Sequence, residues 1–145
     1  MESYIVNQKF KVEANNFNEA GKASSEIKLM LKKIGINSEI SRRIAIASYE
    51  SEMNIVIHSV GGEITLLVSP KEIMLISKDY GPGIEDIEKA MIEGYSTADD
   101  SAREMGFGAG MGLCNIKRCS DSFKIESEIG KGTTLYIKIY MKKGD

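Results

Sequence analysis

The chain has 145 residues and carries 19 basic and 21 acidic side chains, which leaves a net charge of −2. That length fits one domain, residues 1–145, around a single core. The balanced charge excludes a global field that would attract nucleic acid or anionic lipid, so we expect no direct nucleic-acid or membrane partner. No apolar run approaches the length of a membrane span, and the N-terminus lacks the layout of a signal peptide.

Two helices are predicted in the first half of the chain. The first runs over residues 19–34 and should stop at Gly35. The second runs over residues 39–60 and ends before a pair of glycines. The residues expected to cap their N-termini are Asn16 or Asn18 for the first helix and Ser38 for the second.

Strands are predicted from apolar runs that alternate or are bounded by turns. They cover residues 4–12, 63–69, 72–78, 123–128 and 133–141. Two pairs are joined by short turns, which favours antiparallel pairing. In the last strand Leu135, Ile137 and Ile139 alternate with polar or amphipathic neighbours, so helices should cover one face only. The predicted fold is a two-layer α+β sandwich with a mixed, mostly antiparallel sheet.

Both cysteines fall in a short helix predicted after residue 112. Cys114 and Cys119 lie on different faces of that helix. We therefore expect thiols without a special role, because neither a disulfide nor a metal pair fits this spacing. Free thiols favour a cytoplasmic location.

An acidic residue and two glycines follow the third predicted strand, in the sequence "DYGPG". Asp79 ends the strand, Gly81 and Gly83 free the backbone, and Pro82 fixes the turn between them. A plain polar turn would use the same residues. The alternative is a backbone that approaches a ligand closely.

The second predicted helix carries Glu50 and Asn54 four residues apart, on the same face. Burying a carboxylate beside a carboxamide is costly unless both have partners. A solvated helix face explains this pair equally well when the pair is taken alone.

Residues 94–112 have no usable period and are rich in Gly, Ser and Asp. Long loops of this kind in a compact domain are usually functional or mobile. Four glycines precede the next helix, where backbone N–H groups and the helix dipole favour an anion. They are Gly106, Gly108, Gly110 and Gly112. The segment matches neither a P-loop nor a dinucleotide-binding fingerprint, and a simple flexible loop remains an alternative.

The order of these clusters resembles the GHKL (Bergerat-fold) ATPase superfamily. An E-x-x-x-N helix, a strand ending in D-x-G-x-G, a glycine-rich loop opening a helix and "GKGTT" before the last strand all occur in the expected sequence. Within that superfamily, "DYGPGIEDIEKAMIEGYST", "GAGMGL" and "GKGTTLYIKI" are most similar to bacterial anti-sigma regulatory factors with serine/threonine kinase activity.

The resemblance implies a binding site for ATP or ADP with Mg²⁺. In it, Asp79 accepts a hydrogen bond from the adenine amino group, with Thr133 supporting the same edge of the base. Asn54 is the implied Mg²⁺ ligand, and Glu50 the implied general base for a serine or threonine hydroxyl. The remaining implied nucleotide contacts are Gly81, Gly83, Arg103, Gly108, Gly110, Met111 and Gly112.

The resemblance also implies a lid over residues 94–110, a homodimer and a role in partner switching. The substrate would be a small antagonist of an anti-sigma factor, with a sigma factor or a phosphatase as a further partner. The lid departs from the family in its acidic run, which includes Asp99 and Asp100. The alternative function is a non-catalytic switch, in which bound nucleotide sets the shape of a surface that sequesters a sigma factor or activates a phosphatase. The ATP-binding half of a histidine kinase fits less well, because no dimerisation helix pair is present.

Overall fold

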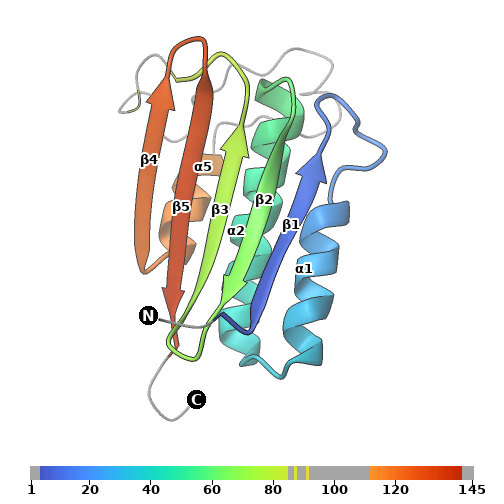
Figure 1. The fold of residues 1–145 in the computed structure, drawn as a ribbon, viewed down its shortest axis with the longest axis vertical. Helices are drawn as coiled ribbons and strands as arrows, with labels where there is room; N and C mark the ends of the chain where they lie inside the picture. Colours follow the sequence, from blue (N-terminus) through green and yellow to red (C-terminus); the bar gives the residue numbers. More distant parts are fainter. Residues whose placement is uncertain (1–3, 85–86, 88–90, 92–111, 142–145) are drawn as a thin grey trace.

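The structure is a computed structural model that describes residues 4–84, 87, 91 and 112–141 (Figure 1). Five strands and three helices make up this described part. In chain order they are β1 (Val6–Val12), α1 (Lys22–Lys33), α2 (Ser38–His58), β2 (Gly62–Val68), β3 (Glu72–Asp79), α5 (Gly112–Cys119), β4 (Ser122–Glu128) and β5 (Gly132–Tyr140). The elements predicted within these ranges therefore occur, with bounds shifted by a few residues, whereas the helical spacing predicted over 85–93 falls mostly outside the described residues.

The strands form one sheet in the order β1-β2-β3-β5-β4, and every neighbouring pair within it is antiparallel. The β2–β3 and β4–β5 pairs are the hairpins expected from the short turns. The last strand, β5, is inserted between β3 and β4. This insertion places Thr133 of β5 directly opposite Asp79 of β3, so two residues far apart in sequence become neighbours at one end of the sheet.

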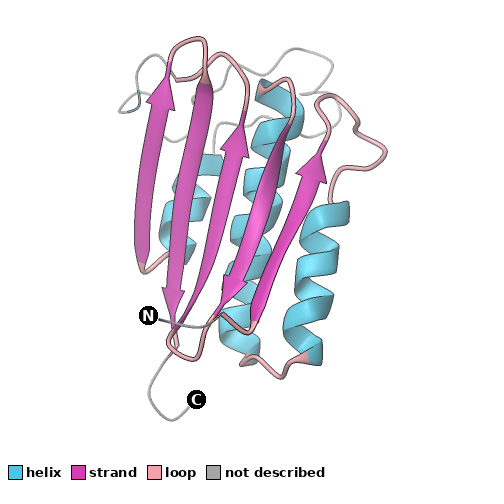
Figure 2. Ribbon diagram, viewed as in Figure 1, coloured by secondary structure: helices cyan, strands magenta, loops and turns pink. Residues whose placement is uncertain are grey.

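The three helices pack on one face of the sheet, with α2 between α1 and α5 (Figure 2). The core between the layers is built from branched aliphatic side chains. It includes Ile27, Leu31, Ile44, Ile55, Ile64, Leu66, Ile73, Leu75, Ile116, Ile137 and Ile139, each fully buried. The two-layer α+β sandwich is thereby confirmed. None of the helices in the described ranges combines the length and the apolar character needed to cross a membrane.

The predicted helix caps are wrong, whereas the predicted stop is confirmed. The α2 N-cap is Asn37, whose side chain accepts hydrogen bonds from the backbone N–H groups of Glu39 and Ile40. The cap expected at Ser38 is therefore one residue too late. The first helix starts after Gly21 rather than after an asparagine, and it has no side-chain cap of its own. It ends before Gly35, which has a φ of +80°, the left-handed conformation typical of a helix stop.

A distant carboxylate replaces the missing cap of α1. Glu52 of α2 is only 2% exposed. Its Oε2 accepts hydrogen bonds from the backbone N–H groups of Gly21 and Ala23, at 3.0 and 3.1 Å, and its Oε1 accepts one from Ser24 at 3.0 Å. The first N–H groups of a helix lack partners within the helix and carry its positive dipole end. One buried acid on α2 therefore satisfies three of them and fixes α1 against α2.

Candidate functional site

Asp79 lies at the end of β3, and its backbone runs between two glycines of the neighbouring strands. Gly62 of β2 is paired with Asp79, and Gly132 is the first residue of β5, directly before Thr133, which is paired with Asp79 on the other side. A Cβ atom on Gly62 would overlap the carbonyl of Lys78, and one on Gly132 would overlap the carbonyl of Asp79. Since both positions exclude a side chain, the strands approach closely around Asp79.

One of the two carboxylate oxygens of Asp79 is hydrogen-bonded within the protein. Its Oδ1 accepts a hydrogen bond from the backbone N–H of Gly81 at 2.9 Å. In the described part of the chain, Oδ2 has no hydrogen-bond partner. Because an ionised carboxylate only accepts hydrogen bonds, Asp79 can present Oδ2 to a donor outside the protein.

The turn after Asp79 packs between the end of α2 and the β4–β5 turn. A Cβ atom on Gly81 would lie 2.9 Å from Oγ of Ser59, and one on Gly83 would lie 2.5 Å from the carbonyl oxygen of Glu128. Gly83 also has a φ of +85°, which other residues rarely adopt. Both glycines are therefore required by the close packing of this turn against the end of α2 and the β4–β5 turn.

The second half of the site lies where α2 meets the N-terminus of α5. A Cβ atom on Gly112 would lie 3.0 Å from Oδ1 of Asn54 and 3.5 Å from Oε2 of Glu50. Both side chains are half-buried. The structure thus brings Glu50 and Asn54 together with the first residue of α5, and the exposed-face explanation for this pair does not apply.

The two halves are joined through the end of α2. Ser59, which caps that helix, follows Asn54 by little more than one turn and contacts Gly81. In Figure 1 the ends of α2 and β3 and the β4–β5 turn all lie at the upper end of the view. One end of the molecule therefore holds the carboxylate of Asp79, the first residue of α5 (Gly112) and the pair of Glu50 and Asn54.

Several predicted site residues lie outside the described residues. They are Arg103, Gly108, Gly110 and Met111, together with the predicted lid over 94–110 and its Asp99 and Asp100. Within the described ranges no group of three or more His, Cys, Asp or Glu side chains is arranged to hold a metal ion. The amide oxygen of Asn54 is a type of ligand that Mg²⁺ accepts, beside water and phosphate oxygens.

Sequence reasoning missed two polar residues that support the site. The side-chain amide of Asn115 on α5 donates a hydrogen bond to Oε2 of Glu50 at 3.3 Å. The hydroxyl of Ser127 on β4 contacts the hydroxyl of Thr133 at 2.9 Å. The sequence offered one signal for Asn115, which lies one helical turn after the glycine-rich run that ends at Gly112. Its partner Glu50 lies on another helix, so the hydrogen bond itself could not be predicted. Ser127 reads as an ordinary residue of an edge strand.

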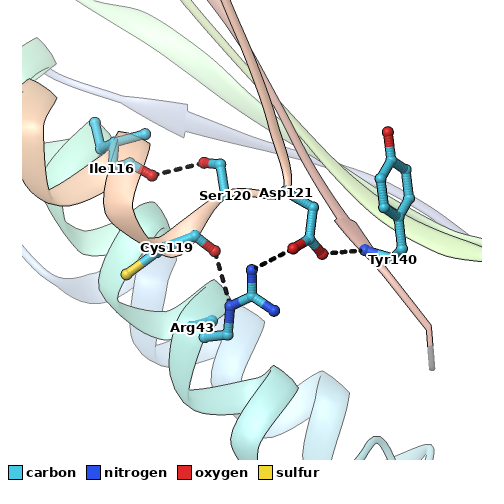
Figure 3. Close-up of polar contacts among 6 residues, drawn as sticks. All are labelled: Arg43, Ile116, Cys119, Ser120, Asp121 and Tyr140. Atoms are coloured by element: carbon cyan, nitrogen blue, oxygen red, sulfur yellow. Dashed lines mark hydrogen bonds and ion pairs between the residues drawn. The ribbon is translucent and has the colours of Figure 1, made fainter.

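A salt bridge fixes the other end of α5 to α2 (Figure 3). The guanidinium of Arg43 donates from Nε to the carbonyl of Cys119 and from Nη2 to Oδ1 of Asp121, each at 2.9 Å. Oδ2 of Asp121 accepts the backbone N–H of Tyr140 at 2.8 Å, which adds β5 to the same cluster. A cation at the C-terminus of a helix also interacts favourably with the helix dipole. Arg43 therefore holds the last turn of α5 in place.

Both cysteines are free thiols, as expected. The Sγ of Cys114 donates a hydrogen bond to the carbonyl of Met91 at 2.7 Å. Burial raises the pKa of the Cys119 thiol, against the smaller lowering effect of Arg43 and Arg42. A raised pKa leaves less thiolate at neutral pH, so Cys119 is suited to packing rather than to nucleophilic chemistry.

Comparison with known proteins identifies the family. The family model described as histidine kinase-, DNA gyrase B- and HSP90-like ATPase matches residues 39–143, which is well over half of the chain. The chain belongs to this family. The resemblance predicted from the E-x-x-x-N helix, the D-x-G-x-G turn and the glycine-rich loop is confirmed, and the matched range contains every element that forms the site.

The curated relatives are a bacterial protein kinase and bacterial anti-sigma factors. Serine/threonine-protein kinase RsbT of Bacillus subtilis is 33% identical over 108 residues, which cover 72% of this chain and 75% of the relative. An anti-sigma F factor of Clostridium acetobutylicum is 32% identical over 142 residues, which cover 81% of this chain and 91% of the relative. An anti-sigma F factor of a Thermoanaerobacter strain is 33% identical over 103 residues, 68% of each chain. These names agree with the function predicted from the motifs.

Proposed function

We propose that this protein is an ATP-dependent serine/threonine protein kinase that acts as an anti-sigma regulatory factor. The observation that carries the proposal is the meeting of Glu50, Asn54 and Gly112 at the start of α5. Membership of the ATPase family and the names of the relatives support the same function. We propose that residues 1–145 form one catalytic domain.

The adenine end of the proposed site is formed by Asp79, by Thr133 and by the turn that follows Asp79 and packs against the end of α2. Oδ2 of Asp79 can accept a hydrogen bond from the exocyclic amino group of adenine. Gly81 and Gly83 allow the turn to lie against neighbouring backbone, so the floor under the base is free of side chains. Their tight contacts make this part of the site preformed, which reduces the ordering cost of binding.

The phosphate end of the proposed site is formed by α2 and α5. Gly112 places the positive end of the α5 dipole beside the phosphates. Gly108, Gly110, Met111 and Arg103 are further proposed phosphate contacts. Asn54 would hold Mg²⁺ through its amide oxygen, and the ion, when bound, supplies positive charge to the phosphate oxygens.

Glu50 is the proposed general base. A serine or threonine hydroxyl of the protein substrate attacks the γ-phosphorus, the bond to the β-phosphate oxygen breaks, and ADP leaves. The carboxylate of Glu50 takes the hydroxyl proton as the new bond between the hydroxyl oxygen and the γ-phosphorus forms. Asn115 holds Oε2 of this carboxylate, so the base keeps one orientation while its other oxygen remains available.

The proposed substrate is a small antagonist protein of an anti-sigma factor. A sigma factor, or a phosphatase in its place, is the proposed binding partner, and we propose a homodimer located in the cytoplasm. The names of the relatives support a regulatory role of this kind, and the free thiols suit a reducing compartment.

The test is phosphate transfer from labelled ATP, with Mg²⁺ present, to the candidate antagonist. Wild-type protein should label the antagonist on serine or threonine. Glu50→Gln should abolish transfer and retain ATP binding, because the amide cannot take a proton. Glu26→Gln, the same change on the exposed face of α1, is the matched control and should transfer phosphate normally.

The outcomes separate the two functions considered. Normal transfer by Glu50→Gln would refute Glu50 as the base. ATP binding by the wild type without transfer to any antagonist would instead favour the non-catalytic switch. Absence of adenine-nucleotide binding would refute both.

A further inference from the structure

The hydroxyl of Ser127 connects three segments around the proposed adenine site. It accepts a hydrogen bond from the backbone N–H of Ile84 at 2.7 Å. It donates to the carbonyl of Gly132 at 3.3 Å and contacts Oγ1 of Thr133 at 2.9 Å. Ser127 therefore joins the end of the "DYGPG" turn to the first two residues of β5.

These three contacts can be made together in one arrangement of protons. A hydroxyl has one hydrogen to donate and two lone pairs to accept with. The N–H of Ile84 occupies one lone pair of Ser127, and the carbonyl of Gly132 can only accept, so it takes the hydrogen of Ser127. Thr133 must then donate its own hydrogen to the second lone pair of Ser127. The Thr133 hydroxyl is left with lone pairs alone for any further partner.

Thr133 and Asp79 are direct neighbours in the β3–β5 register. Thr133 is only 7% exposed, so water does not readily reorient its hydroxyl. Asp79 offers an oxygen without a partner among the described residues, and a carboxylate also only accepts. Two acceptors thus lie side by side at the end of the sheet, which is complementary to a group with two N–H donors.

We propose that Ser127 is a positioning residue that fixes Thr133 as an acceptor and so makes the site select 6-amino over 6-oxo purines. The proposal rests on the proposed binding of an adenine nucleotide. The 6-amino group of adenine carries two donors, whereas guanine and hypoxanthine have an acceptor oxygen at that position. A 6-oxo base would face two acceptors and leave buried polar groups without partners, which sites of this kind reject strongly.

Removal of the Ser127 hydroxyl should relax this selection. In Ser127→Ala the Thr133 hydroxyl loses the acceptor that holds its hydrogen, so it can rotate and donate to a 6-oxo group. One restored hydrogen bond corresponds to about a tenfold change in affinity. We therefore expect the ratio of the dissociation constants of inosine triphosphate and ATP to fall about tenfold.

The experiment is a calorimetric titration of ATP, inosine triphosphate and GTP into the full chain with Mg²⁺. Ser122→Ala, on the exposed face of the same strand, is the matched control and should keep the wild-type ratio. If wild type binds ATP but Ser127→Ala weakens all three nucleotides equally, Ser127 only anchors the turn at Ile84 and the inference is wrong. If wild type binds none of them, the proposed function itself fails.

A second pair of variants tests whether Ser127 acts through Thr133. Thr133→Val removes the hydroxyl of Thr133 but leaves the bond from Ile84 to Ser127. When two residues act as a unit, the double variant resembles one of the single variants. The double variant Ser127→Ala/Thr133→Val should therefore have the same nucleotide ratio as Thr133→Val alone. Multiplication of the two single effects on that ratio would overturn the proposal, and thermal unfolding of each variant verifies that it is folded.

Discussion

The buried carboxylate of Glu52 leads to a quantitative prediction for stability. In Glu52→Gln a single acceptor oxygen replaces two. If that oxygen takes the place of Oε2, the bonds from Gly21 and Ala23 are kept. The new amide NH₂ then faces the N–H of Ser24, donor against donor, in place of the bond at 3.0 Å.

The cost follows from the loss of one charge-assisted hydrogen bond and from a buried donor left without a partner. A hydrogen bond to a charged group contributes about 1.5–3 kcal/mol, and an unsatisfied buried donor costs about 1–3 kcal/mol. These ranges partly describe the same loss, so we expect Glu52→Gln to lower the free energy of unfolding by about 3 kcal/mol. For a chain of this size each kcal/mol lowers Tm by about 2–4 °C, so Tm should fall by about 6–12 °C.

Urea denaturation and thermal unfolding measure these changes, with Glu26→Gln on the exposed face of α1 as the control. The control should lie within about 0.5 kcal/mol of the wild type. Amide hydrogen exchange should become faster at Ser24, whose hydrogen bond is lost, than elsewhere in the core. A Glu52→Gln protein as stable as the control would show that the bond from Ser24 does not stabilise α1, and the account of this helix start would be wrong.

Two further predictions concern α5. In Gly112→Ala the new methyl group would crowd Asn54 and Glu50, so Mg²⁺–ATP affinity should fall about tenfold in calorimetry, or about 1.4 kcal/mol. Its unfolding free energy should stay within about 1 kcal/mol of wild type, because alanine is the better helix former; unchanged affinity would argue against phosphates at this helix start. For Cys119, burial raises the pKa of the thiol in the folded protein. The buried neutral thiol therefore contributes its full stability below the thiol pKa of the unfolded chain, about 8.5. This contribution is lost as the pH rises through the pKa of the thiol in the folded protein. Urea denaturation from pH 7 to 10 should therefore show a loss of stability that is smaller in Cys119→Ser, and equal pH dependence of both proteins would contradict this.

The sheet was predictable from the sequence because each strand carries its own pattern. Alternation of Leu135, Ile137 and Ile139 with polar neighbours marks the buried face of β5, and the structure buries these three residues. Short turns fix hairpin pairing without reference to the rest of the chain. Information that is local in sequence was thus sufficient for the strands, the hairpins and the placing of helices on one face.

The start of α1 was not predictable, because its cap is remote. Asn16 and Asn18 satisfied the local rule for an N-cap, yet the helix begins at Lys22 after a glycine. The acceptor is Glu52, which lies 31 residues beyond Gly21. Nothing in the sequence near the helix start indicates this partner, since only the packing of α1 on α2 brings the two together.

The candidate site shows the same division. The four-residue spacing of Glu50 and Asn54 predicted that they share a face, and Gly112 was predicted from the glycine-rich run before α5. The hydrogen bonds from Asn115 to Glu50 and between Ser127 and Thr133 depend on which helix or strand lies alongside. Motifs therefore located the proposed ligand contacts, while the residues that orient those contacts required the structure.

The helix α2 sets the geometry of the proposed phosphate end, because α5 is fixed to it at both ends. The last turn of α5 is held by Arg43 through Cys119 and Asp121, and its first residue lies against Asn54. A helix of 8 residues is only about 12 Å long, so a shift at either end moves the whole of α5. The salt bridge of Arg43 thus contributes to the position of Gly112 although it lies at the opposite end of the helix. Loss of this anchor would displace the helix start from Asn54, and the proposed site would lose its alignment without any change in the residues that contact the nucleotide.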